Sequence, residues 1–114
     1  MVEYKFEAAK RSAISRAYYG SFNVARRQLE EHGIPIENRR AHDQVWRTFR
    51  VRDRATFNTK EKWRTVGELG GALRALRNQA DYADQVRMLD KQAVDAVDSA
   101  ERIMVLLDEL EFVD

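Results

Sequence analysis

A short stretch from Arg77 to Tyr82 concentrates side chains that could bind or transform an anion. Arg77 follows Leu73 by four residues and precedes Ala80 by three, so on a helix it borders the apolar face. A guanidinium there needs a partner, because an unpaired buried charge is costly. Asp81, one helical turn later, could pair with it as a strut within the protein. Alternatively, Arg77 could hold a phosphate or a nucleobase at a groove, and the sequence alone allows both interpretations.

Two adjacent tyrosines on the first predicted helix are a second candidate element of a site. Tyr18 and Tyr19 point about 100° apart on a helix. Tyr18 lies on the apolar face, whereas Tyr19 forms a polar edge with Arg16 and Asn23 that could line a cleft. The alternative is that each hydroxyl finds a buried hydrogen-bond partner and has only a structural role.

The chain has two histidines, His32 and His42, and no cysteine. Thiol nucleophiles, disulfides and cysteine-ligated zinc are therefore excluded. Two histidines without a carboxylate cluster at ligand spacing predict no metal site. The sequence also lacks a phosphate-binding glycine loop and a nucleophile elbow, and we expect no cofactor. His42, near the start of the second predicted helix, could face a groove or remain a surface residue.

Charge is unevenly distributed although the net charge is only +1. Residues 39–64 hold nine Lys and Arg against three acidic residues, and residues 81–114 hold ten acidic residues against three basic ones. A basic surface interleaved with aromatic side chains can bind single-stranded nucleic acid. Trp46, Phe49 and Trp63 have core spacing, which leaves Phe57 as the aromatic residue expected at the surface. The plainer interpretation is two ordinary solvated helix faces.

Four helices must position these side chains. Apolar residues at spacings of three and four predict helices over Glu3–His32, Arg40–Arg52, Lys60–Tyr82 and Leu89–Leu110. Gly33 is placed to close the first helix in the left-handed conformation. The polar stretch between the second and third helices predicts a loop, with a short extra helix as the alternative. No segment alternates like a strand, so the expected fold is an all-α, antiparallel four-to-five-helix bundle that forms one domain over residues 1–114.

Two details of these helices bear on packing. Glycines 67, 70 and 71 inside the third helix should each cost up to ~1 kcal/mol relative to alanine, which predicts a kink or a close approach of another backbone. The apolar face predicted for the fourth helix consists of Ala93, Val97, Ala100, Met104 and Leu107, with Ile103 and Leu110 beside it. No apolar run approaches the ~20 residues that span a bilayer, and no secretory signal precedes the first helix. We therefore expect a cytoplasmic protein without membrane contact.

Two segments, SRAYYGSFNVAR (residues 15–26) and LRALRNQADYAD (residues 73–84), together with the stretch from His42 to Phe49, resemble the small stand-alone HEPN proteins. The order and spacing of these motifs match over residues 9–84. The resemblance implies a helical bundle that tends to form homodimers. It also implies an RNA-directed role in toxin–antitoxin or antiviral defence systems, in which many HEPN proteins are metal-independent endoribonucleases.

The same resemblance implies site residues. Arg77 and Asn78 match the start of the HEPN motif, in which an Arg and a polar residue are followed by a His four to six positions beyond the Arg. Here that His is missing, and positions 81 and 82 hold Asp81 and Tyr82. Cleavage needs one group to deprotonate the 2′-hydroxyl and another to protonate the leaving 5′-oxygen. Asp81 and Tyr82 would have to serve with Arg77, and neither titrates near neutrality unless its pKa is strongly perturbed.

Two functions therefore follow as hypotheses. The first is a dimeric, metal-independent endoribonuclease with Arg77, Asp81 and Tyr82 as catalytic residues. The second is a non-catalytic module that binds a nucleotide, RNA or a protein partner, and the missing His favours it. In both cases we expect four residues to line the binding groove: Arg16, Tyr19, His42 and Asn78. The resemblance also implies a nucleotidyltransferase-type antitoxin as partner, since in some HEPN toxins such a partner modifies a Tyr at about the position of Tyr82.

Overall fold

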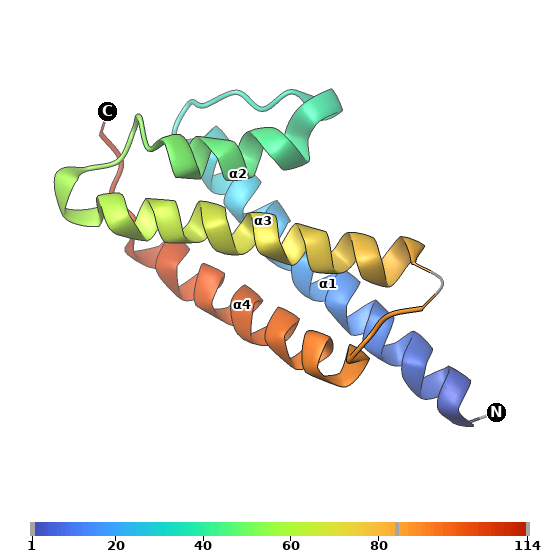
Figure 1. The fold of residues 1–114 in the computed structure, drawn as a ribbon. Coiled ribbons are helices and arrows are strands. Elements are labelled where there is room, and N and C mark those ends of the chain that lie inside the picture. Colours follow the sequence, from blue (N-terminus) through green and yellow to red (C-terminus); the bar gives the residue numbers. More distant parts are fainter. Residues whose placement is uncertain (1, 84, 114) are drawn as a thin grey trace.

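The computed structural model describes the backbone of residues 2–83 and 85–113 and the side chains from residue 5 onward within those ranges. The described chain forms the helices α1 (Val2–Glu31), α2 (Ala41–Val51), α3 (Lys60–Tyr82) and α4 (Leu89–Glu109). Two single turns of 3₁₀ helix, η1 (Asn38–Arg40) and η2 (Phe57–Thr59), precede α2 and α3 (Figure 1). The all-α fold class is confirmed, and each predicted helix boundary lies within one residue of the observed one.

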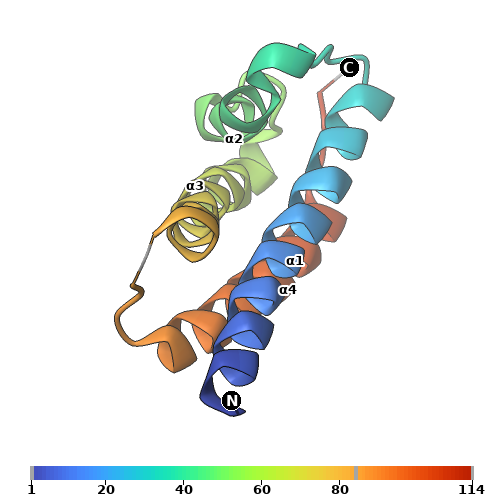
Figure 2. The ribbon, with the colours of Figure 1, turned by 90° about the vertical axis from the view of Figure 1, so that its right-hand side faces the viewer.

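The directions of the helices differ in part from the antiparallel bundle expected from the sequence. α3 runs opposite to its neighbours, as the ion pair between Lys62 and Glu109 at the start of α3 shows for α4. α1 and α4, however, run in the same direction (Figures 1 and 2). Lys10, in the N-terminal part of α1, pairs with Asp90 at the N-terminus of α4. Gln28, near the C-terminus of α1, donates a 2.8 Å hydrogen bond to the Leu107 carbonyl near the C-terminus of α4. α1 and α4 share a direction because the connection after α1 turns at Gly33 (φ 79°) and runs back along the bundle before α2 begins (Figure 1).

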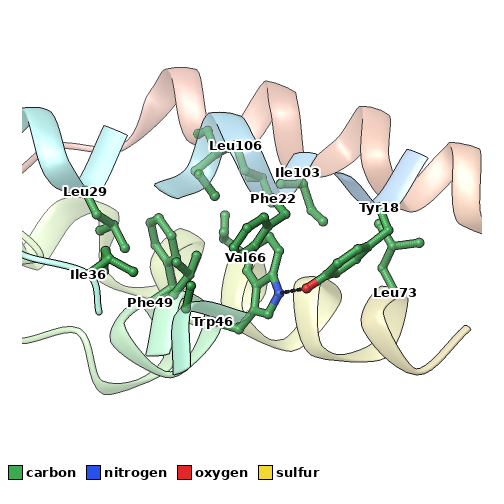
Figure 3. Close-up of a cluster of buried hydrophobic side chains, with 14 of the residues drawn as sticks. Tyr18, Phe22, Leu29, Ile36, Trp46, Phe49, Val66, Leu73, Ile103 and Leu106 are labelled. Carbon is green, nitrogen blue, oxygen red and sulfur yellow. Dashed lines mark hydrogen bonds between the residues drawn. The ribbon is translucent and has the colours of Figure 1, made fainter. Parts of the chain in front are cut away.

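The core lies where the four helices meet (Figure 3). The inward face predicted for α1 from spacings of three and four residues is confirmed, because all five of its residues are buried: Ile14, Tyr18, Phe22, Ala25 and Leu29. The predicted inward face of α4 is only partly correct. Its buried residues are Ala96, Ile103, Leu106 and Leu107, whereas Val97 and Met104 are 40% and 42% exposed. α4 has more apolar residues than one contact face can use, so the spacing alone did not determine its rotation.

Close helix packing explains two of the three glycines in α3. A Cβ atom at Gly67 would lie 2.7 Å from the Trp46 carbonyl oxygen and 2.8 Å from the backbone nitrogen of Arg50. A Cβ atom at Gly70 would overlap the Trp46 ring. Of the two interpretations left by the sequence, the close approach of another helix is therefore the correct one at these positions. This approach packs Trp46 and Arg50 of α2 directly against α3.

The segment after α4 folds back over the end of the bundle. The Val113 amide donates a 2.7 Å hydrogen bond to the Arg54 carbonyl, and the Trp63 indole donates one of 3.1 Å to the Glu111 carbonyl. The Phe112 ring stacks on His32 at 3.6 Å between centroids. These contacts join the segment after α4 to the loop between α2 and α3, to Trp63 of α3 and to His32 just after α1. Among the described residues, no helix combines the length and apolarity needed to cross a membrane.

Candidate functional site

Side chains from α1, α2 and α3 converge around the guanidinium of Arg77. Arg77 is only 7% exposed, which places it deeper than the margin position expected from the sequence. Its guanidinium carbon lies 5.2 Å from the centroid of the Tyr18 ring and 5.1 Å from that of Tyr19. A cation over aromatic faces at this distance is attracted by about 0.5–2 kcal/mol per ring. The adjacent tyrosines of α1 thus hold Arg77 in one orientation.

Arg77 keeps much of its hydrogen-bonding capacity. The nearest carboxylate oxygen is Oδ2 of Asp81, at 3.6 Å from Nη1, which is an ion pair but too long for a good hydrogen bond. Nε of Arg77 is buried without a hydrogen-bond partner. A guanidinium has five N–H donors, and leaving buried donors unsatisfied costs about 1–3 kcal/mol. The ion pair predicted between Arg77 and Asp81 is present, but it does not saturate the guanidinium.

A chain of hydrogen bonds orients His42 beside this guanidinium. The Trp46 indole N–H donates to the Tyr18 hydroxyl oxygen at 3.1 Å (Figure 3). An indole can only donate, so the Tyr18 hydroxyl receives this bond and directs its own hydrogen elsewhere. The Tyr18 oxygen lies 2.7 Å from Nδ1 of His42. Nδ1 of His42 is the only acceptor that the described residues place within reach of the Tyr18 hydrogen, so we assign this bond as donated by Tyr18, which puts the proton of neutral His42 on Nε2.

The surroundings keep this imidazole neutral. Burial, followed by the positive charges of Arg74, Arg77 and Arg26, lowers the pKa of His42 below its usual value of 6.5. The imidazole also stacks on Phe22 at 4.1 Å between ring centroids, which limits its contact with water on one face. Burial raises the pKa of the Tyr18 hydroxyl from its usual 10.0, so this group stays protonated as a donor. His42 is consequently a hydrogen-bond donor through Nε2 at neutral pH.

We refer to Arg26, His42, Arg74 and Arg77 as the basic cluster. Arg26 is held by the Asn38 side-chain oxygen at 2.7 Å and by Glu30 at 3.4 Å. Nε of Arg74, like that of Arg77, is buried without a hydrogen-bond partner. The cluster combines three permanent cations with one neutral N–H donor, and such a set fits an anionic oxygen ligand.

The structure brings some of the sequence-predicted residues together and separates others. Arg77, Asp81, Tyr19 and His42 gather, and the Tyr19 and His42 rings meet edge to face at 5.9 Å. The remaining three do not join them. Asn78 is exposed on α3, Tyr82 is 75% exposed at the end of α3, and Arg16 lies along the groove between α1 and α4.

Sequence reasoning missed Arg26 and Arg74. Arg74 precedes Arg77 by three residues, a spacing that places both on one side of a helix and could have indicated the pair. Arg26 follows Phe22 by one turn and carries no comparable signal. The role of Trp46 as a hydrogen-bond donor was also not visible, because its spacing marks it only as a core residue.

The arrangement can bind an anion more readily than it can transfer a proton. A general base must offer a lone pair, but the outward nitrogen of neutral His42 already carries a proton. A general acid of useful strength would require the imidazolium form, which burial and then the neighbouring arginines disfavour. Among the described residues, no three His, Asp or Glu side chains gather as a metal site. No protein-family model, curated protein or solved structure matches the chain.

Proposed function

We propose that this protein is an RNA-associated, HEPN-like module of a toxin–antitoxin or antiviral defence system, and that the basic cluster binds a phosphate group of RNA. The observation that carries this proposal is Arg77, a buried guanidinium fixed between two tyrosine rings with unused donors. A permanent cation kept in such a position without a saturating carboxylate is suited to an anionic oxygen. Arg74 and the Nε2 proton of His42 supply further donors to the same ligand.

Binding rather than cleavage is the better account of this geometry. The hydrogen bonds from Trp46 to Tyr18 and from Tyr18 to His42 define a donor, not a base. Asp81 forms an ion pair with Arg77, and Tyr82 is 75% exposed at the end of α3. A non-catalytic phosphate-binding module therefore takes precedence over the metal-independent endoribonuclease implied by the resemblance.

The proposal includes a partner of the nucleotidyltransferase type. The resemblance implies that such an antitoxin would modify Tyr82, and a side chain that is 75% exposed is accessible for this reaction. Incubating the protein with a co-encoded nucleotidyltransferase and a nucleoside triphosphate should add a nucleotide mass to the wild type but not to Tyr82→Phe. Equal labelling of both proteins would exclude Tyr82 as the acceptor.

The RNA proposal is tested by fluorescence anisotropy with a 5′-labelled single-stranded RNA in the presence of chelator. Charge-assisted hydrogen bonds contribute about 1.5–3 kcal/mol, so Arg77→Gln should weaken binding about tenfold to a hundredfold. Arg74→Gln, at a less buried position of the same cluster, should act in the same direction. Arg64→Gln is the matched control, because it removes the same charge from an exposed site on α3. It should change the affinity by less than about threefold.

Two results would contradict the proposal. Equal losses in Arg77→Gln and Arg64→Gln would show that RNA binds a diffuse basic surface and not the cluster. Absence of binding by the wild type, with the fold verified by circular dichroism, would remove the RNA-associated function. Gel analysis of the same mixtures covers catalysis. Fragments formed by the wild type and lost in Arg77→Gln would favour the endoribonuclease instead.

A further inference from the structure

The ion pair between Arg77 and Asp81 is loosely built. Oδ2 of Asp81 lies 3.6 Å from Nη1 of Arg77, beyond the range of about 2.7–3.2 Å for a good hydrogen bond. The arginine precedes the aspartate by four residues on α3, which is the weaker order for such a pair on a helix. Among the described residues, this ion pair is the only polar contact of the Asp81 carboxylate. Tyr18 and Tyr19 fix the guanidinium, so the carboxylate is the more movable partner of the pair.

The position of Asp81 on α3 is unfavourable for a carboxylate. Asp81 is the next-to-last residue of the helix, where the partial negative charge of the last carbonyl groups repels an acidic side chain. α3 has no basic residue in its last turn. Arg11 of α1 donates instead to the Ala80 and Ala83 carbonyls, at 2.9 and 2.8 Å. The helix itself therefore does not favour Asp81 at this place, and its carboxylate can rotate away from Arg77 at small cost.

The ion pair is exposed mainly on its Asp81 side. The Asp81 side chain is 28% exposed and that of Arg77 is 8% exposed. A ligand that arrives from water therefore meets the carboxylate before it meets the guanidinium. Once the carboxylate moves away, Arg77 is a buried cation that needs another anion as its partner. Asp81 and an anionic ligand thus compete for the same cation.

We propose that a terminal phosphate group of RNA displaces Asp81 and takes its place on Arg77, an inference that rests on the RNA-binding function proposed above. The charge of the basic cluster suits such an exchange. Its three arginines have two acidic partners, Glu30 at 3.4 Å from Arg26 and Asp81 on Arg77, which leaves a net charge of +1. Asp43, at the start of α2, is exposed and forms no ion pair with the described residues. When Asp81 moves away, the net charge of the cluster becomes +2.

This charge distinguishes the end of an RNA from its interior. An internal phosphodiester carries one negative charge, the same as the carboxylate that it would replace, and Asp81 competes as a tethered group at an effective concentration of about millimolar or more. A terminal phosphate carries a charge of about −1.5 to −2 at pH 7 and three free oxygens. It therefore matches the +2 of the cluster without Asp81. An RNA end also brings one nucleoside to the buried Arg77, whereas an internal phosphate brings one on each side.

The first arm of the test compares RNA ends by fluorescence anisotropy in chelator. Single-stranded RNAs of one sequence carry a fluorophore at one end and either a phosphate or a hydroxyl at the other. The wild type should bind the phosphorylated RNA at least about tenfold more tightly, because only that end offers the second charge. Adenosine monophosphate, added as competitor, separates an RNA end from a free nucleotide. It should compete at least about tenfold less well than unlabelled phosphorylated RNA, because it lacks the further phosphates of the chain.

The second arm removes the internal competitor. If the Asp81 carboxylate occupies Arg77 for about 70–90% of the time, Asp81→Asn should bind phosphorylated RNA about threefold to tenfold more tightly than the wild type. Asp81→Ala, which also removes the carboxylate, should act alike. Glu68→Gln is the matched control, because Glu68 pairs with Arg64 on the same helix, at 3.7 Å and with the same spacing and order. This control should change the affinity by less than about twofold. In an Arg77→Gln background, Asp81→Asn should give no gain.

Several outcomes would overturn the proposal, each read with helicity unchanged by circular dichroism. Equal affinity of the wild type for both RNA ends excludes a terminal phosphate and leaves the RNA-binding function standing, whereas no affinity for either RNA removes that function as well. Equal competition by adenosine monophosphate assigns the site to a free nucleotide. Unchanged or weaker binding by both Asp81 variants excludes the displacement. A gain of the same size in Glu68→Gln, or in the Arg77→Gln background, attributes the effect to overall charge.

Discussion

Replacing Tyr18 with phenylalanine tests the hydrogen-bond chain that orients the candidate site. The Tyr18 side chain is fully buried, and its hydroxyl accepts from the Trp46 indole and donates to Nδ1 of His42. Tyr18→Phe removes both bonds and leaves the Trp46 N–H, in a side chain that is 1% exposed, without an acceptor. A lost hydrogen bond costs about 1 kcal/mol, and an orphaned buried donor about 1–3 kcal/mol. We expect the free energy of unfolding to fall by about 2–3 kcal/mol.

Urea denaturation followed by circular dichroism measures this change, and Tyr19→Phe is the matched control. The Tyr19 ring is 39% exposed and none of the described residues hydrogen-bonds its hydroxyl, so its removal should cost less than about 0.5 kcal/mol. Nitrogen NMR of the imidazole provides a second readout. In the wild type at neutral pH, His42 should be the Nε2–H tautomer, and in Tyr18→Phe this preference should be lost.

The reasoning would be refuted by either of two results. If Tyr18→Phe and Tyr19→Phe cost the same, the buried chain of hydrogen bonds does not contribute to stability. If His42 of the wild type carries its proton on Nδ1, Nε2 is an acceptor, and the argument for binding over proton transfer no longer holds.

Three further predictions concern stability. Because the pKa of His42 is lowered in the folded state, the unfolded chain binds more protons, and stability is lost as pH falls from about 6.5 toward that lowered pKa. Urea midpoints measured between pH 7.5 and 5.5 should therefore fall more steeply for the wild type than for His42→Gln. Gly70→Ala should lower the free energy of unfolding by about 1–3 kcal/mol, because the added Cβ would overlap the Trp46 ring. Gly71→Ala is the control: its Cβ meets only a flexible Arg side chain, so the change should be neutral or stabilising by up to ~1 kcal/mol. Phe112→Ala removes a ring that stacks on His32 and meets Trp63 edge to face, and it should lower the thermal midpoint, with about 2 kcal/mol lost. An unchanged midpoint would show that the C-terminal segment does not stabilise the bundle.

The helices were predictable because their signals are local. Gly33 adopts the left-handed conformation expected at the end of α1, and α3 begins and ends at the residues that the pattern indicated. The inward face of α1 was also predictable, since one apolar stripe dominates it. The inward face of α4 was not, because apolar residues surround more than half of this helix and the neighbours decide which of them are buried.

The candidate site was predictable only in part. Arg77 and Asp81 are neighbours on one helix, and their pairing follows from a spacing of four residues. The placement of His42 beside Arg77 joins residues 35 positions apart on different helices, and no local rule indicates it. Likewise, the acceptor of the Trp46 indole depends on how α2 crosses α1, which the sequence pattern does not specify.

The sequence by itself determined the helices, the residue types available for chemistry and the absence of any thiol, because each of these depends on neighbours along the chain or on composition. The tertiary structure decided the rest. It made α1 and α4 parallel, gave Arg77 two tyrosine rings and an unsaturated guanidinium, and left an apolar groove between α1 and α4. These features depend on the order in which helices cross and on the rotation of each about its axis, and both are set by packing over the whole bundle.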